Sequence, residues 1–297
     1  NKPFGDAHDA AYDVDATARC FFGLITNRVI HVNEIKNVDD VKYEAPTLAE
    51  ANFEDLHTKQ TKGDDVLKVA KEVTDTLTDV PFVHLHNHSE FSILQSTTKV
   101  NKLVLKAKEF GMDAVALTDH GNMMATFHFV RDALKEGIKP IVGCEFNLCA
   151  DRKNKSLKDD GFQTVLIAKN KNGYQNLIKL ASYANTEGFY YVPRIDRELL
   201  LEYKTDLIAL SGGIWGEIPN KILFEGTNHA EEAVLWWKEH FGDDFYIEIN
   251  RHGVAEQNEI NKVLLEFAKN HQIKYIAANN TYYLDKSDAE SKDVLYC

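Results

Sequence analysis

Short apolar segments alternate with amphipathic helical segments from Phe82 onward, and this alternation constrains the fold more than any other feature of the chain. Helical periodicity is clear in KVNKLVLKAKEFG, HFVRDALKEG, NGYQNLIKLASYA, AEEAVLWWKEHFG and EQNEINKVLLEFAKNH. Strand-like segments are FVHLH, AVALTD, KPIVGCEFNL, TVLIAK, DLIALSG, FYIEIN and KYIAAN. Strands that alternate with helices form a mostly parallel sheet with helices outside it. We therefore predict an α/β protein whose sheet is closed, or nearly closed, into a barrel.

The first 80 residues do not follow this pattern. Residues 1–33 contain a helix-like stretch, DVDATARCFFGLI, and residues 34–80 are polar and charged with few apolar anchors. We predict an N-terminal helical segment (1–33), a linker with room for short helices (34–80) and a barrel domain (81–297). The chain starts on Asn rather than Met and stops just after the helix-like SDAESKDVLYC, so we expect both ends to continue in a longer protein.

Composition argues against several classes of protein. The formal net charge of −12 argues against a chain that grips a nucleic-acid backbone by itself, because phosphate binding uses clustered Lys and Arg. No apolar run is long enough to span a membrane and no signal peptide is visible. The 4 cysteines form no CxxC pair, which is typical of free thiols in a reducing compartment. We expect a cytoplasmic protein with no membrane partner.

Three histidines stand at alternate positions in the segment HLHNHSEFS. On an extended strand His84, His86 and His88 would project from the same face. Three imidazoles within such a short segment suggest metal coordination, and the alternative is a solvent-exposed strand face that happens to be rich in histidine.

Polar side chains also follow several predicted strands, at the carboxyl ends where α/β folds collect reactive residues. They are Asp119, His120, Glu145, Asn250, Arg251, His252, Asn279 and Asn280. Taken singly, such residues are common as caps and turn formers. Histidine and carboxylate ligands that converge from several strand ends suit Zn, Mn or Fe, and a metal there supplies a hydroxide for phosphoester hydrolysis.

Seven ordered blocks of sequence resemble the PHP domain of bacterial DNA polymerase III alpha subunits. They are HLHNHSEFS, AVALTDHGNM, IKPIVGCEF, VLIAKNKNGYQNLIKL, EGFYYVPRID, LSGGIWGEIP and YIEINRHG, and the resemblance covers residues 80 to 297. It implies a distorted seven-stranded (β/α) barrel of PHP type, related to histidinol phosphatase, in which active members bind three metals. It also implies a parent polypeptide that is a DNA-directed DNA polymerase, with Mg in a polymerase core that follows Cys297.

Carrying the family's metal site over residue by residue retains four ligands. His86 and His88 match the HxH motif, His120 matches the TDH motif, and Glu145 matches the acidic ligand after GC. His84 stands where many relatives have Asp, and we do not count it as a ligand.

Five further ligand positions hold residues that are poor ligands for such a cluster: Gln95, Gln163, Gly213, Asn280 and Tyr282. With few carboxylates to balance them, three divalent ions in one pocket would repel one another. We therefore predict either one divalent ion, Zn or Mn, or none, on His86, His88, His120 and Glu145.

The segment HDAAYD places His8 five residues before Asp13. It resembles the last motif of DEDDh 3′–5′ proofreading exonucleases, in which the His acts as general base and the Asp holds one of two metals. The other exonuclease carboxylates would lie upstream of Asn1, so this chain would not cut DNA with that site by itself.

Three hypotheses follow. In the first, the barrel is a structural scaffold of a replicative polymerase, whose partners are the rest of that polymerase chain, DNA bound by the polymerase core, a fused or docked proofreading exonuclease, the sliding clamp and other replisome subunits. In the second, the barrel is a metal-dependent phosphoesterase or 3′–5′ proofreading nuclease that acts through the four retained ligands. The third is a free-standing PHP-like binding protein, which EGFYYVPRID and GYQNL disfavour because they resemble the polymerase branch.

Independently of these hypotheses, we expect Arg194 and Asp196 to pair as a structural salt bridge.

Overall fold

The computed structural model describes residues 82–295, and the predicted segments 1–33 and 34–80, with His8 and Asp13, lie outside them. Seven strands form one sheet: β1 (Ala114–Leu117), β2 (Lys139–Cys149), β3 (Phe162–Ala168), β4 (Arg194–Asp196), β5 (Leu207–Leu210), β6 (Phe245–Ile249) and β7 (Lys274–Ala277). The α-helices are α4 (Val100–Glu109), α5 (Thr126–Glu136), α6 (Lys171–Thr186), α7 (Arg197–Tyr203), α8 (Glu217–Phe224), α9 (Thr227–Phe241), α10 (Ala255–Asn270) and α11 (Ala289–Leu295). Two 3₁₀ turns are η3 (Gly242–Asp244) and η4 (Lys286–Asp288). The predicted α/β fold is confirmed.

The sheet has the strand order β1-β2-β3-β5-β6-β7, and β4 pairs with β2 outside this path. The pairs β1–β2, β2–β4, β5–β6 and β6–β7 are parallel, whereas β3 is antiparallel to both β2 and β5. The sheet is therefore mostly parallel, as predicted. The exception arises because β2 and β3 are joined by a loop without a crossover helix, and a direct connection of this kind reverses the chain.

The predicted strand FVHLH is not a strand. This segment and the two residues that follow it nevertheless join the two edges of the sheet. On one side the amide of Ala116 donates to the carbonyl of His84, and that of Thr118 donates to Asn87, both at 2.9 Å. On the other side the amide of His88 donates to the carbonyl of Thr281 at 2.9 Å, beyond the end of β7. The segment is irregular because side chains take part in its hydrogen bonds. For example, the backbone N–H of Asn87 donates to the side-chain Oγ1 of Thr118 at 3.1 Å. Residues 84–88 thus bridge the two edges of the curled sheet.

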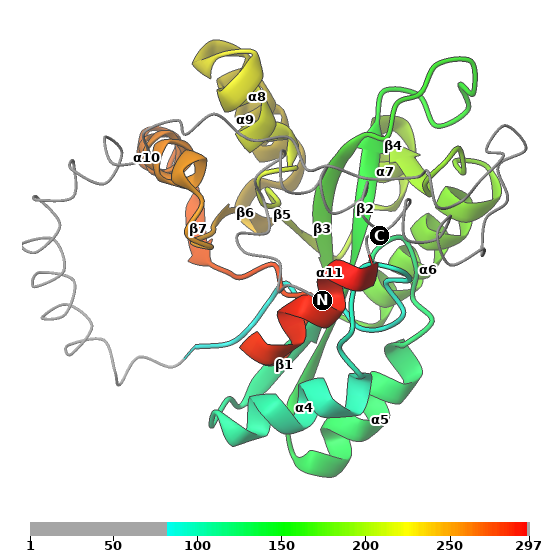
Figure 1. Cartoon of the computed structure of the whole chain (residues 1–297). Coiled ribbons are helices and arrows are strands. Elements are labelled where there is room, and N and C mark those ends of the chain that lie inside the picture. Colours follow the sequence, from blue (N-terminus) through cyan, green and yellow to red (C-terminus); the bar gives the residue numbers. More distant parts are fainter. Residues whose placement is uncertain (1–81, 296–297) are drawn as a thin grey trace, which may run out of the picture. The chain divides into compact units, whose positions relative to one another are not determined.

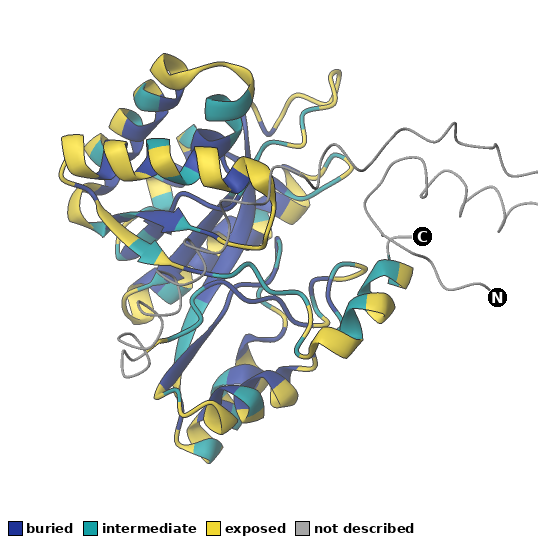
Figure 2. Cartoon of the chain, turned by 60° about the vertical axis from the view of Figure 1, so that its left-hand side comes forward, coloured by how far each residue is buried: buried dark blue, intermediate teal, exposed yellow. Residues whose placement is uncertain are grey.

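Helices cover the sheet in groups that follow the chain order (Figure 1). α4 and α5 lie against β1 and β2, α6 lies against β2, β3 and β4, and α9 and α10 lie against β6. Figure 2 shows buried residues in the sheet and on the inner helix faces, with exposed residues outside. The largest core cluster includes Leu166, Leu177, Trp237, Phe245 and Leu264, and burial of each such side chain contributes about 1.5–3 kcal/mol.

Two short helices, α7 and α8, were not predicted because seven or eight residues carry too little periodicity. Their starts are nevertheless well specified. Asp196 caps α7 by accepting from the amide of Leu199 at 3.0 Å, and Pro219 lies in the first turn of α8, where an amide donor is not needed. None of the described helices is both long enough and apolar enough to cross a membrane.

Arg194 and Asp196 do not pair with each other, contrary to our expectation. Asp196 instead accepts from the guanidinium of Arg152, with Nη1 at 2.8 Å from both carboxylate oxygens. Arg194 is fully buried and donates to backbone carbonyls of Gly188 and Asp159, at 3.0 and 2.9 Å, and of Arg152 and Asn154. The cap on α7 and the Arg152 pair already use the Asp196 carboxylate, so Arg194 is satisfied by carbonyl oxygens of two loops.

Candidate metal centre

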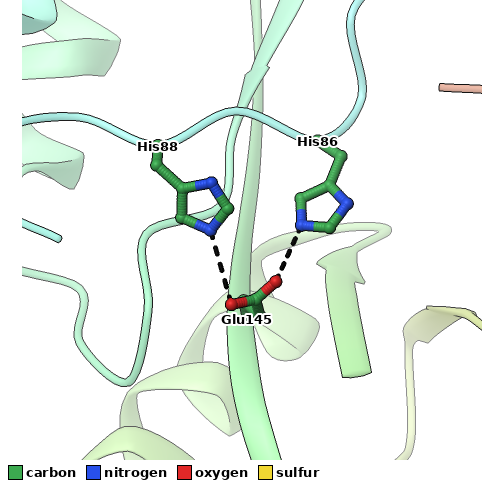
Figure 3. Close-up of side chains that lie close together, drawn as sticks. All are labelled: His86, His88 and Glu145. Carbon is green, nitrogen blue, oxygen red and sulfur yellow. Dashed lines mark hydrogen bonds and ion pairs between the residues drawn. The ribbon is translucent and has the colours of Figure 1, made fainter. Parts of the chain in front are cut away.

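His86 and His88 project from the irregular segment into the barrel, where both are fully buried. The residue between them fixes their direction. Asn87 donates through its side-chain nitrogen to the carbonyl of Ala116 at 2.9 Å and accepts from Thr281 Oγ1 at 2.6 Å. Because the Asn87 side chain is held toward Ala116 and Thr281, the rings of His86 and His88 on either side of it point at Glu145 on β2 (Figure 3).

One carboxylate connects the two histidines. His86 Nε2 lies 2.9 Å from Glu145 Oε2, and His88 Nε2 lies 3.5 Å from Glu145 Oε1. Each of the three residues offers a ligand atom, and these atoms lie within 4.8 Å of one another. Among the described residues, this is the group whose donor atoms are close enough to share one metal ion.

A second carboxylate, Glu248 on β6, binds the same histidine and was not predicted. Its Oε1 lies 2.9 Å from His86 Nδ1 and accepts from the side-chain nitrogen of Asn250 at 2.9 Å. The sequence signal was a single charged residue inside the otherwise apolar strand FYIEI, since an ionisable group in such a place needs a buried partner. Glu145 and Glu248 therefore hold His86 from both ring nitrogens.

These contacts set the charge of the site. Burial alone would lower the pKa of the His86 imidazole, but the charge of Glu248 and hydrogen bonds to both carboxylates raise this pKa to about 10. Burial would raise the pKa of the Glu145 carboxyl, but His88 and His86 beside it hold that pKa well below its usual range. At neutral pH an imidazolium therefore lies between two carboxylates.

His120 lies beside this group but is held by another residue. Its Nδ1 lies 2.8 Å from the side-chain nitrogen of Gln95. Its Nε2 is buried and has no hydrogen-bond partner among the described residues. The neighbouring Asp119 is buried and accepts from Ser89 Oγ and Ser92 Oγ, both at 2.7 Å, so it fixes the loop that carries Gln95.

The other substituted ligand positions are filled or closed in different ways. The ring of Tyr282 stacks on that of His88, with centroids 4.2 Å apart and planes 2° apart. Gly213 has room for a side chain, since an added Cβ would lie 3.6 Å from Asn250 Nδ2. Gln163 and Asn280 each keep a buried side-chain oxygen without a hydrogen-bond partner.

The donor set fits one metal ion but not a cluster of three. His88 Nε2 and Glu145 Oε1 are buried without a hydrogen-bond partner, and an ion between them would satisfy both. Apart from Glu248 and His120, the positions left for a second and third ion hold neutral amides, a tyrosine ring and a glycine. His84 is outside the group, half-buried with its ring edge-on to Phe82, and burial lowers its pKa.

Comparison with known proteins places the chain in a family. Residues 84–252 match the PHP domain. This chain belongs to the PHP domain family. The chain is 40% identical over 220 residues to DNA polymerase III subunit alpha of Borreliella burgdorferi (73% of this chain, 19% of that protein) and 42% identical over 221 residues to that of Thermus aquaticus (72% and 18%). The resemblance to the PHP domain of these alpha subunits is thereby confirmed.

The chain spans less than a fifth of the length of these PHP-containing relatives. Solved structures of similar fold include a putative metal-dependent phosphoesterase from Bifidobacterium adolescentis, at 12% identity and a TM-score of 0.46 over 70% of this chain and 89% of the other. An amidohydrolase from Chromobacterium violaceum has 10% identity and a TM-score of 0.45, over 72% and 96%. Similarity this distant says nothing about the chemistry of the present chain.

Proposed function

We propose that this chain is the PHP-domain region of a bacterial DNA polymerase III alpha subunit, a cytoplasmic DNA-directed DNA polymerase of chromosomal replication. The observation that carries the proposal is 38–42% identity to alpha subunits over nearly three quarters of the chain. The parent polypeptide is then a nucleotidyltransferase whose polymerase core binds DNA and Mg. Its partners are the sliding clamp, other replisome subunits and a proofreading exonuclease.

Within that polymerase, we assign the barrel the role of a structural and docking scaffold. Three features of the described residues support this role. Both ring nitrogens of His86 contact carboxylates, the Tyr282 ring stacks on His88, and the Gln95 side chain contacts His120 Nδ1. Each feature satisfies by hydrogen bonding or packing a position that a trinuclear hydrolase would use to bind ions.

Metal analysis of the purified chain tests the scaffold role. We expect no more than one tightly bound transition-metal ion per chain after dialysis, measured by inductively coupled plasma mass spectrometry, because among residues 82–295 only the His86–His88–Glu145 group has converging ligand atoms. If one ion is found, His88→Ala should remove it. Two or more ions per chain would contradict the scaffold role.

A second function is favoured by the two unpartnered buried atoms, His88 Nε2 and Glu145 Oε1. An ion bound there would polarise a phosphoester oxygen and generate hydroxide from water. The barrel would then be a metal-dependent phosphoesterase or 3′–5′ proofreading nuclease that uses His86, His88, His120 and Glu145. The competing source of proofreading is the exonuclease motif of His8 and Asp13, which lies outside the described residues.

Primer extension from a mismatched 3′ end separates these functions. We expect the intact polymerase to extend matched primers and to remove a mismatched nucleotide, and we expect His8→Ala to slow that removal by about 10²–10⁴-fold through loss of a general base. His120→Ala, which removes a ring held only at the edge of the barrel site, should leave it unchanged. The opposite pattern would identify the barrel as the nuclease, and failure to extend matched primers would refute the polymerase assignment.

A further inference from the structure

A line of exposed apolar side chains runs along the outer side of α5. Met124, just before the helix, and Phe127 and Leu134 within it are 55%, 73% and 65% exposed. Spacings of three and seven residues put them on one face, over about 15 Å of helix axis. The inner face of α5, with Phe129 and Ala133, is packed in the core against α4, and exposed residues lie outside (Figures 1 and 2). α5 therefore has a second apolar face, which none of the described residues covers.

The turn that carries Ile93 and Leu94 extends this apolar face. Both side chains are exposed, and Leu94 has a φ of 62°, a left-handed conformation that is strained for leucine. Asn122 joins the turn to Met124, since its Nδ2 donates to the carbonyl of Phe91 at 2.8 Å and its Oδ1 accepts from the amide of Met124 at 3.1 Å. The fold thus maintains a strained backbone that keeps an apolar side chain in solvent, which is typical of a site that binds something.

Positive charge borders this face of α5. At about 100° per residue, Arg131 and Lys135 fall beside the apolar side chains, whereas Asp132 and Glu136 fall on the far side of the helix. The two acids also have partners, because Asp132 pairs with Arg131 at 2.7 Å and Glu136 pairs with Lys108 of α4 at 2.9 Å. The border of the apolar face is therefore basic, on a chain whose net charge is −12.

We propose that this surface, the α5 stripe, binds an amphipathic helix of a partner protein that carries Asp or Glu beside its own apolar face. The stripe consists of Ile93, Leu94, Met124, Phe127 and Leu134. A single ridge of side chains fits the groove of a second helix, and acidic flanks on that helix complement the basic border. The phosphates of DNA would match the basic border but offer no apolar surface to cover the stripe. The proposal names a docking surface of the barrel and so rests on the scaffold role proposed above.

Designed helical peptides test the chemistry of the partner. The probe is a fluorescein-labelled peptide with leucine along one face and glutamate on both sides of it, and its twin has lysine in place of glutamate. By fluorescence anisotropy with the full chain, we expect the glutamate peptide to bind at least about tenfold more tightly than the lysine peptide. Phe127→Ala should weaken binding of the glutamate peptide by about tenfold or more, as the loss of an interface anchor does.

Phe224→Ala is the matched control. Phe224 is 74% exposed, against 73% for Phe127, but it lies on α8 outside the stripe, so this variant should bind the glutamate peptide as the unsubstituted chain does. No binding, equal binding of the two peptides, or equal weakening by the two substitutions would overturn the proposal. Sedimentation of the chain with vesicles of equal parts phosphatidylglycerol and phosphatidylcholine, lost in Phe127→Ala, would identify a lipid surface instead and would also overturn it.

Photo-crosslinking locates the natural partner. With p-benzoylphenylalanine in place of Phe127, in an intact polymerase that still extends matched primers, we expect crosslinks to a segment with acidic residues beside an apolar helical face, identified by mass spectrometry. Crosslinks to DNA or to a second copy of this chain, or none, would contradict the proposal. The metal content of the same preparation tests the scaffold role separately, so the two can fail independently.

Discussion

Glu145→Ala is expected to lower the free energy of unfolding by about 3–5 kcal/mol, because removing one partner of a buried ion pair leaves the other charge uncompensated. Glu145 is fully buried and contacts both His86 and His88, at 2.9 and 3.5 Å. Without it, the His86 imidazolium keeps only Glu248, its Nε2 loses its acceptor, and His88 loses a carboxylate neighbour. The quantity to measure is the urea-unfolding free energy of the chain at pH 7, with an unchanged m-value.

The controls separate charge from volume. Glu145→Gln keeps the shape and one acceptor oxygen, so its loss of stability should be smaller than that of the alanine variant. Glu232→Ala removes a carboxylate that is 74% exposed and should change stability by less than about 0.5 kcal/mol. A Glu145→Ala loss as small as that of Glu232→Ala would show that the buried charges are not coupled.

Glu248 provides a stricter form of the same prediction. Because Glu145 and Glu248 share His86 as a partner, their alanine substitutions should not be additive, and the double variant should differ from the sum by about 0.5–3 kcal/mol. Additive losses would mean that the two carboxylates act independently. The geometry around His86 predicts non-additive losses, because Glu145, His86 and Glu248 interact as one unit.

The fold was largely predictable because its longer helices carry a strong period. α6, α9 and α10 each have 15 or 16 residues with one apolar face, and two of the strands between them, β5 and β6, are mostly apolar. β4 has only 3 residues and was missed, since so short a strand is specified by its pairing with β2 rather than by local pattern. The segment FVHLH has strand composition, but its bonding partners are side chains as well as strands, which a periodicity argument cannot see.

The candidate site was predictable only where a motif carried it. His86, His88 and Glu145 came from family motifs, and the structure brings the three together. Glu248 is 162 residues from His86 in sequence, and only the closure of the sheet brings them to 2.9 Å. The contact between His120 Nδ1 and the Gln95 side chain is likewise a tertiary detail that no residue spacing encodes.

Arg194→Met is expected to destabilise the chain by at least about 3 kcal/mol, because a buried guanidinium makes hydrogen bonds of about 1.5–3 kcal/mol each and its carbonyl partners would be left unsatisfied. The guanidinium is fully buried, with Nε at 3.0 Å from the carbonyl of Gly188 and Nη1 at 2.9 Å from that of Asp159. It also lies over the ring of Tyr190 at 5.4 Å. One side chain therefore joins the β2–β3 loop to the α6–β4 loop.

The expected signature is local as well as global. Besides a lower unfolding free energy, limited proteolysis of Arg194→Met should show faster cleavage in residues 150–161 and 188–193, the two loops that the guanidinium joins. Arg194→Lys should recover little, because an ammonium cannot reproduce the planar fork that reaches four carbonyls. Arg251→Met, at an exposed position, is the control and should change neither quantity. Equal cleavage of both loops in Arg194→Met and the unsubstituted chain would show that other contacts hold them, and that the buried arginine contributes through packing alone.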